Sequence, residues 1–457
     1  MRTLAQVPRP TMDGSAMPFR RRLAFLMSLY VVVVLAGTTI LRSDELGNER
    51  YRMKAIAKTV ADEIQKHYYD PSLKGLDWKA LLEQAKQKID NAKNISEMLT
   101  AIYVMVDKLK DSHTHFIPPS VNVKLKYGFE AKAIGEDVRI YKIVPKLPAE
   151  RGGLKVGDKI IRMNGHTAER YSFDDMLFYY RVLHHLLAWE LVVQTGSDPP
   201  RTVRLTPKRE DKAIVLDINR LSDFWDIILE DESETEEERT YRTANLDGGI
   251  GYIQVREFPE NAEFLDALAD TVKDSKAVIV DLRGCPGGVV DTLRSFAGHF
   301  EANATVMLKA VGRKKTEEIM VKPKKPNFSG RLLVLIDSRT GSAAEVFARF
   351  FQSTGKAMVI GDASLGRVMR SSYYPEEVGA ENIVFYGIQI SNAKVVLPNG
   401  EELEGKGVTP DMPCNPSGDD MREKRDVCMD KAIAKAREAL HLPPQTNKPA
   451  VLEPVKN

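Results

Sequence analysis

Apolar residues form one continuous run near the start of the chain. Residues 23–41 contain no charged side chain, and three arginines, Arg20 to Arg22, precede them. A helix needs about 20 apolar residues to cross a bilayer, so this run predicts a membrane-spanning segment after a cytoplasmic N-terminus at residues 1–22. Because a cleaved signal has a shorter apolar region of about 7–15 residues, the length favours an anchor that is retained. The arginines then place the rest of the chain outside the cytoplasm, in the periplasm or the extracellular space.

Residues 45–118 follow a helical period. Apolar side chains recur at intervals of three and four in "YRMKAIAKTVADEIQKHY" and "NISEMLTAIYVMVDKL", which predicts the amphipathic helices of a small cap region. The pattern ends at "KDSHTHFIPPS", because Pro118 and Pro119 stop a helix. His113 and His115 are therefore expected in an extended segment.

The pattern changes twice more after the cap. Residues 119–210 contain short strand-like runs, and residues 211–246 form an acidic linker around "EDESETEEER", whose like charges predict a solvated loop. In residues 247–414, strand-like runs such as "KAVIVDLRG" and "RLLVLID" alternate with helical stretches, which predicts an α/β core around a largely buried sheet. Residues 415–457 are expected to form a C-terminal helix and a proline-rich, disordered tail.

Composition narrows the classes of function. The 457 residues suit two or three domains, and the formal net charge of +2 gives no argument for a nucleic-acid partner. The three cysteines show no spacing typical of a zinc site, and no nucleotide-binding or zinc-protease motif is present, so we expect neither a metal nor an organic cofactor. In an oxidising compartment Cys414 and Cys428 could close a loop of about 15 residues with a disulfide worth roughly 3 kcal/mol.

Candidate chemistry begins at Ser342 in "DSRTGSAAEVFARF", where an apolar strand gives way to a helix. A serine at this place is either the N-cap of the helix or a nucleophile. Upstream, "VIVDLRGCPGGVVD" places Gly287 and Gly288 after a strand, where their backbone N–H groups either face a developing oxyanion or form a tight turn. Glu345 is expected to be structural, because the helix dipole favours a carboxylate in the first turn.

Residues 119–210 resemble a PDZ domain. The resemblance rests on "YGF" at Tyr127, Gly128 and Phe129 and on the phrase "PAERGGLKVGDKIIRMNG"; the alternative is an unrelated small β-barrel. It implies that a protein or peptide adds a strand beside the loop of these three residues, where backbone N–H groups hold its terminal carboxylate.

The remaining motifs resemble the carboxyl-terminal processing, or tail-specific, serine peptidases of family S41. "DLRGCPGG", "GSAAE", "VIGDASLGR" and "EGKGVTPD" occur in the family's order after the PDZ-like region. The resemblance implies a crotonase-like or ClpP-like α/β core with an N-terminal helical cap and an inserted PDZ domain. It also implies that Ser342 is the nucleophile and that Gly287 or Gly288 forms the oxyanion hole with the N–H of Ala343.

One residue departs from the best-known branch of this family. Those enzymes use a lysine 25 residues after the serine as the general base, and the corresponding residue here is Arg367. Arginine stays charged and cannot accept the proton. The tricorn-like branch instead uses a histidine beside a serine, together with a glutamate near the C-terminal end.

This second branch implies a different base. Its motif matches Ser112 and His113 in "DSHT" and Glu404 in "EGKGVTPD". His113 would take the Ser342 proton, while Glu404, directly or through Ser112, would orient the imidazole. His115 stays an alternative base, because residues two apart on an extended segment share a face.

We therefore expect a membrane-anchored or exported serine endopeptidase. It would cleave polypeptides through an acyl-enzyme intermediate, and its PDZ domain would recognise substrate peptides or their C-termini. The alternative is a catalytically inactive relative that only holds peptides, and Arg367 is the feature that favours it.

Overall fold

The structure, a computed structural model, describes residues 46–119, 123–184, 186–211, 241–379, 383–444 and 453–455. The apolar run of residues 23–41, on which the predicted membrane segment depends, lies outside these ranges, as does most of the acidic linker. Among the described residues, no helix is both long enough and apolar enough to span a bilayer.

The N-terminal helices bury their apolar faces. Residues 46–67 are helical, and after a 3-10 turn (Leu73–Gly75) the helices α2 (Trp78–Asn91) and α3 (Ile95–Asp107) pack against each other. The buried side chains of α3 recur at the spacing of one helix face. They are Met98, Leu99, Ala101, Ile102, Met105 and Val106.

A short strand carries the end of this cap into the core. Strand β1 (His115–Ile117) pairs antiparallel with β18 (Val384–Val396), and His115 lies opposite Gln389. Strands β17 (Met369–Val378) and β13 (Thr305–Gly312) also pair with β18, and β14 (Thr316–Val321) completes this five-stranded sheet. Ser112 and His113 form a turn directly before β1, so the prediction of an extended segment holds for His115 but not for His113. The pairing brings this turn to a strand that follows Ser342 in the sequence.

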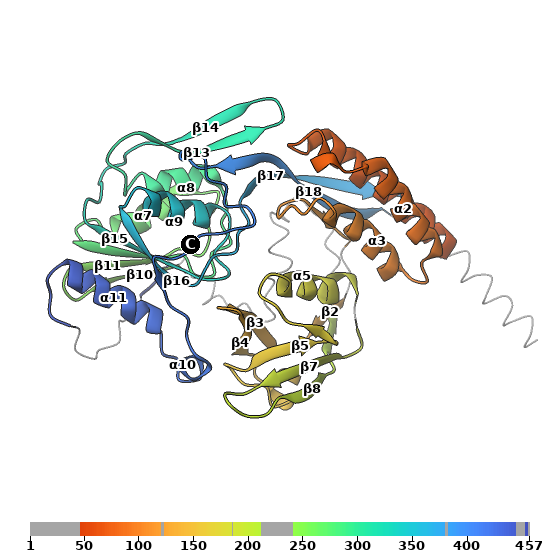
Figure 1. Cartoon of the computed structure of the whole chain (residues 1–457), viewed down its shortest axis with the longest axis horizontal. Helices are drawn as coiled ribbons and strands as arrows, with labels where there is room; N and C mark the ends of the chain where they lie inside the picture. Colours follow the sequence, from red (N-terminus) through yellow and green to blue (C-terminus); the bar gives the residue numbers. More distant parts are fainter. Residues whose placement is uncertain are drawn as a thin grey trace, which may run out of the picture. The chain divides into compact units, whose positions relative to one another are not determined.

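A seven-stranded sheet forms the centre of the core, with helices on both faces (Figure 1). In order, its strands are β19 (Met412–Pro413), β16 (Ala357–Gly361), β15 (Arg331–Ile336), β12 (Ala277–Asp281), β11 (Ile250–Gln254), β10 (Tyr241–Leu246) and β20 (Glu453–Val455). The first five run parallel to one another, as the alternation of strands and helices predicts, and β10 pairs antiparallel with β11.

Strand β12 shows why both faces of this sheet are covered. Val278 and Val280 pack with α7 (Ala262–Asp270), α8 (Val290–Ala297) and α9 (Ala343–Ser353) on one face. Ala277 and Ile279 pack with α11 (Val427–Ala439) on the other face. Because side chains alternate along a strand, a strand between two helical layers is apolar throughout. The predicted α/β core with N-terminal helices is therefore confirmed.

A separate six-stranded sheet carries the PDZ-like sequence. Its strands are β3 (Phe129–Ile134), β4 (Asp137–Ile143), β5 (Lys159–Met163), β6 (His166–Thr167), β7 (Trp189–Gln194) and β8 (Arg201–Leu205). Helices α4 (Pro148–Arg151) and α5 (Phe173–Phe178), followed by a π-helical turn (Tyr179–Leu183), belong to the same region. Strands β2 (Val123–Lys126) and β9 (Lys208–Asp211) pair where the chain enters and leaves it.

Two segments differ from the predicted domain limits. Residues 241–246, placed in the linker by their position, form β10, and residues 453–455 form β20, which pairs antiparallel with β10. An edge strand leaves backbone N–H and C=O groups unpaired, and β20 supplies partners for those of β10. The prediction of disorder therefore does not hold for these three residues of the tail.

Cys414 and Cys428 form a disulfide, which confirms the predicted pairing. It joins the end of β19 to the start of α11. Two residues before Cys428, the carboxylate of Asp426 lies 2.7 Å from the guanidinium of Arg283, which follows β12. The disulfide and this ion pair both hold the start of α11 against the sheet. Cys285 is a buried free thiol, and burial raises its pKa to about 12.

Reducing this disulfide should lower the free energy of unfolding by roughly 3 kcal/mol, because a closed loop of about 15 residues restricts the unfolded chain. Urea unfolding with and without reductant would measure the difference. The matched control is the Cys414→Ala/Cys428→Ala double variant, on which reductant should have no effect. Equal unfolding midpoints for the oxidised and reduced wild type would contradict the prediction.

Candidate active site

Ser342 lies at a sharp turn between β15 and α9. Its φ is 50°, a left-handed conformation that is costly for a residue with a side chain and is typical of functional turns. Its N–H donates to the carbonyl oxygen of Arg367 at 3.0 Å and to Glu345 Oε2 at 2.9 Å. The turn is thus held by the first turn of its own helix and by a loop that follows later in the sequence.

A glycine loop lies directly against this turn. A methyl group added to Gly287 would lie 2.6 Å from Ser342 Cβ and 2.9 Å from the backbone nitrogen of Ala343. The loop is anchored because Phe258 N–H donates to the Gly287 carbonyl oxygen at 2.7 Å. Among the described residues, no hydrogen-bond acceptor is found for the N–H groups of Gly287, Gly288 and Ala343. Donors of this kind beside a serine suit the binding of an oxyanion.

Three other predicted site residues form a hydrogen-bonded relay. Ser112 Oγ donates to Glu404 Oε2 at 2.7 Å and lies 2.9 Å from His113 Nδ1. The N–H of Ser112 donates to Glu404 Oε1 at 3.0 Å. Glu404 therefore reaches the imidazole through Ser112 rather than directly. Because Nδ1 is engaged with the serine, Nε2 is the nitrogen left for a reacting group.

Burial controls the ionisation of this relay. His113 is 5% exposed, and desolvation lowers its pKa to about 4, against the attraction of Asp111 and with a smaller repulsion from Arg367. Desolvation also raises the pKa of Glu404, while the hydrogen bond from Ser112 opposes this shift. A neutral imidazole at pH 7 can accept a proton, which a general base must do.

The Ser342 turn and the relay are connected through two adjacent residues. Arg367 accepts the Ser342 N–H, and Val368 N–H donates to Glu404 Oε2 at 2.8 Å. No hydrogen bond joins the Ser342 and His113 side chains, both of which are described in the structure. Catalytic hydrogen bonds are often long in unliganded sites and shorten when substrate binds.

The side chain of His115 has a different environment. Its Nε2 lies 2.6 Å from the carbonyl oxygen of Ser112, so this nitrogen donates to the backbone. Desolvation lowers its pKa well below the usual value. His113 contacts the Ser112 hydroxyl that is bound to Glu404, whereas His115 contacts the Ser112 backbone.

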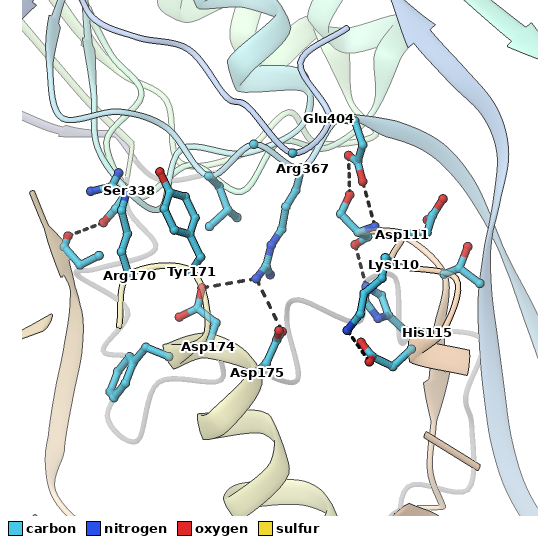
Figure 2. A pocket seen from close by; sticks show the side chains of 18 of the residues that line it. Lys110, Asp111, His115, Arg170, Tyr171, Asp174, Asp175, Ser338, Arg367 and Glu404 are labelled. Atoms are coloured by element: carbon cyan, nitrogen blue, oxygen red, sulfur yellow. Dashed lines mark hydrogen bonds and ion pairs between the residues drawn. The ribbon is translucent and has the colours of Figure 1, made fainter. Parts of the chain in front are cut away.

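Arg367 points away from the relay. Figure 2 shows its side chain extending from the loop toward Asp174 and Asp175 of α5. Its guanidinium lies 3.9 Å from Asp174 and 3.8 Å from Asp175. The residue at the lysine position therefore supports the site through its backbone and contacts the PDZ-like region through its side chain.

A cavity of about 270 Å³ opens beside these residues. Its wall combines side chains from the cap, from β3 and α5, and from the core loops, and includes Ser112. Figure 2 shows three other members of this wall, His115, Arg367 and Glu404. Two relay residues, Ser112 and Glu404, line this cavity, whereas Ser342 and His113 do not. No cluster of His, Cys, Asp and Glu side chains that could hold a metal ion occurs in the described parts of the chain.

The side chains of the predicted peptide loop of the PDZ-like region pack into the interior of that region. Tyr127 and Phe129 are fully buried, and the Tyr127 ring stacks on Trp189 with centroids 3.6 Å apart. Gly128 has φ +88°, and a methyl group there would lie 2.3 Å from Leu147 Cβ. β3 follows this loop as an edge strand of its sheet, the position at which a peptide strand adds.

Asp337 links the two regions and was not among the residues predicted from the sequence. Asp337 accepts hydrogen bonds from Lys132 Nζ of β3 at 2.6 Å and from Gly284 N–H at 2.9 Å. Burial opposes ionisation of this carboxyl, but Lys132 and the backbone donors outweigh it and hold its pKa well below the usual range. Only its place in "DSRTGS", directly after an apolar strand, could have drawn attention to it.

Comparisons with known proteins identify families for two regions of the chain. Residues 249–414 match the sequence model of peptidase family S41, and residues 120–176 match that of the PDZ domain. The chain is 23% identical over 357 residues to carboxyl-terminal-processing peptidase 1, chloroplastic, of Arabidopsis thaliana, covering 74% of this chain and 66% of that protein. It is 23% identical over 416 residues to a carboxyl-terminal-processing protease of a Picosynechococcus species, covering 87% of this chain and 92% of that protein.

A solved structure shares the fold. The structure of mature CPAF complexed with lactacystin aligns with a TM-score of 0.64 at 13% sequence identity. The alignment covers 86% of this chain and 99% of that one.

Replacing Gly287 with Ala should reduce modification of Ser342 by a serine-reactive fluorophosphonate by about 100-fold or more, because the new methyl group would displace Ser342 or Ala343 N–H. Gly284→Ala is the matched control. Gly284 also has a positive φ, +73°, but nothing lies within 4 Å of the added methyl group. Equal labelling rates for the two folded variants would show that the close approach is unimportant.

Proposed function

We propose that this chain, which belongs to peptidase family S41 and carries a PDZ domain, hydrolyses peptide bonds of polypeptides with Ser342 as its nucleophile. The observation that carries the proposal is the relay of Glu404, Ser112 and His113, joined through Arg367 and Val368 to the Ser342 turn. The relay supplies what Arg367 cannot, a group that accepts a proton at neutral pH.

In this mechanism Ser342 Oγ attacks the carbonyl carbon of the scissile peptide bond. His113 Nε2 takes the hydroxyl proton and then gives it to the leaving amine, which leaves an acyl-enzyme. His113 Nδ1–H donates a hydrogen bond to Ser112 Oγ, whose hydroxyl donates one to Glu404, so the charge on the imidazolium is stabilised along the relay without further proton transfer.

The Ala343 N–H, together with that of Gly287 or Gly288, would stabilise the oxyanion of both tetrahedral intermediates. A water molecule, activated by His113, then releases the acyl group by hydrolysis. No step requires a metal or an organic cofactor.

The PDZ domain would hold the substrate by adding a peptide strand to β3. Lys132 and Ala133 of this strand line the cavity that also contains Ser112 and Glu404, so a chain bound there is close to the relay. A terminal carboxylate would be held by the backbone of Tyr127, Gly128 and Phe129.

A second candidate function is peptide binding without hydrolysis. It is favoured by Arg367 at the lysine position and by the missing hydrogen bond between Ser342 and His113 among the described contacts. A binding protein would retain the PDZ site and the cavity but would not react with a fluorophosphonate.

Ser342→Ala and His113→Ala should each abolish nearly all cleavage of an unfolded protein substrate, and the double variant should be little worse, because members of a catalytic unit are strongly non-additive. Arg367→Met should retain measurable turnover, since its side chain faces α5. His115→Ala is the control, because it removes the neighbouring histidine and leaves His113 in place. Wild-type rates in folded His113→Ala would refute the assignment of the base.

We also propose that the body of the protein lies outside the cytoplasm, held by residues 23–41 or exported. A reporter enzyme that is active only after export, fused behind Asn457, should be active in cells. The same fusion without residues 1–41 should be inactive. Activity of a cytoplasm-specific reporter at Asn457 would contradict this topology.

A further inference from the structure

Glu345 makes more contacts than a helix cap requires. Its side chain is fully buried, and its carboxylate accepts four hydrogen bonds. Oε2 accepts from the N–H groups of Ser342 at 2.9 Å and Arg367 at 3.0 Å. Oε1 accepts from Gly366 N–H at 2.7 Å and from Ser364 Oγ at 2.5 Å.

A capping box needs only the first of these contacts. The chain offers a direct comparison at α10 (Gly418–Arg422), where Asp420 accepts from the N–H and Oγ of Ser417, within the same cap. Asp420 is only partly buried and also pairs with Arg425, its near neighbour in sequence, whereas Glu345 is fully buried and binds a loop about 20 residues away in sequence. Starting a helix does not explain the contacts of Glu345 to residues 364–367.

The loop of residues 364–367 and the Ser342 turn are tied together around this carboxylate. Leu365 N–H donates to the Thr340 carbonyl oxygen at 2.9 Å, and Ser342 N–H donates to the Arg367 carbonyl oxygen at 3.0 Å. The carboxylate of Glu345 lies between these two hydrogen bonds and joins the Ser342 turn to residues 364–367. If its carboxylate moved, Ser342 would lose one support directly and a second through the shift of Arg367.

The contacts also require a charged carboxylate. All four partners are donors, and an ionised carboxylate only accepts. A protonated carboxyl group carries a hydrogen of its own, so at least one of the four contacts would break or reverse. None of the charged side chains in the described structure forms an ion pair with Glu345, so its position depends on these four neutral donors.

We propose that Glu345 is a positioning residue of the reaction, whose ionised carboxylate holds Ser342 in its left-handed conformation and keeps residues 364–367 aligned with the relay. This inference rests on the proposed role of Ser342. Glu345 does not touch the substrate, because it is fully buried behind the turn.

The proposal implies a particular dependence on pH. Burial raises the pKa of Glu345 to about 7, although the four donors oppose the shift. As pH falls through this value the carboxylate gains a proton, and the reactivity of Ser342 should fall with it. The charged or titratable groups on the surrounding elements are Arg349 of α9, Arg367 of the loop, Glu404 and Lys406 of the segment that packs against Gly366, and His113 of the relay. His113, with a pKa of about 4, would cause a separate loss at lower pH.

The test measures fluorophosphonate labelling of Ser342 and the kcat and KM of peptide cleavage in the full chain. Glu345→Gln keeps the shape of the side chain but replaces one carboxylate oxygen with an NH₂ group. This NH₂ group would face two of the four hydrogen-bond donors and could accept from neither. Its kcat and labelling rate should fall about 10–100-fold, as expected for lost hydrogen bonds to a charged group, with KM changed less than about threefold. Asp420→Asn, the matched capping-box variant, should match the wild type.

The pH profile separates positioning from a general loss of structure. The wild-type labelling rate should fall as pH decreases through about 7, and this fall should be absent in Glu345→Gln. Ser364→Ala removes one of the donors that favour the ionised carboxylate of Glu345. The labelling rate of this variant should therefore begin to fall at a higher pH than that of the wild type. This second variant tests the inference even where Glu345→Gln does not fold.

Three results would overturn the inference: a folded Glu345→Gln with wild-type kcat, a loss confined to KM, or a pH profile that neither variant changes. If the wild type itself is not labelled at Ser342 and does not cleave peptides, the proposed function fails and this inference fails with it. A labelled wild type with an unaffected Glu345→Gln would sink the inference alone.

Discussion

Two parts of the chain that are distant in sequence meet at the hydrogen bond from Ser342 N–H to the carbonyl oxygen of Arg367, and the proposed chemistry depends on this contact. Ser342 belongs to the turn before α9, and Arg367 precedes β17. The next residue, Val368, holds Glu404, which in turn holds Ser112. A displacement of this loop would therefore move the nucleophile and the relay together.

Arg367 stands where related enzymes have the lysine base, and it gives the loop of residues 364–367 a supporting role in the proposed site. Its backbone keeps both contacts with the Ser342 region, while its side chain lies between the core and Asp174 and Asp175. After burial, repulsion from Arg367 is one cause of the low pKa of His113. A permanent positive charge thus helps keep the imidazole neutral, which a lysine acting as a neutral base would not do.

Local patterns were sufficient to predict most of the fold. Strand β12 is apolar because both faces of its sheet are covered, and "DSHT" and "EGKGVTPD" marked the members of the relay by motif. Contacts between distant residues leave no such pattern. The four partners of Glu345, the Lys132 to Asp337 pair and the pairing of β20 with β10 all depend on how the chain folds back on itself. Glu345 was therefore interpreted from its position in the helix alone.

The central claim is that His113 is the base for Ser342, and the distance between Ser342 Oγ and His113 Nε2 tests it most directly. We would measure it by crystallography of the protein after reaction with a substrate-like peptidyl fluorophosphonate. If His113 is the base, the reagent should be bonded to Ser342 Oγ, with His113 Nε2 within about 2.6–3.2 Å of that oxygen or of the leaving-group position. A covalent adduct on Ser342 with His113 remote from it, and with another titratable side chain beside the adduct, would show that His113 is not the base.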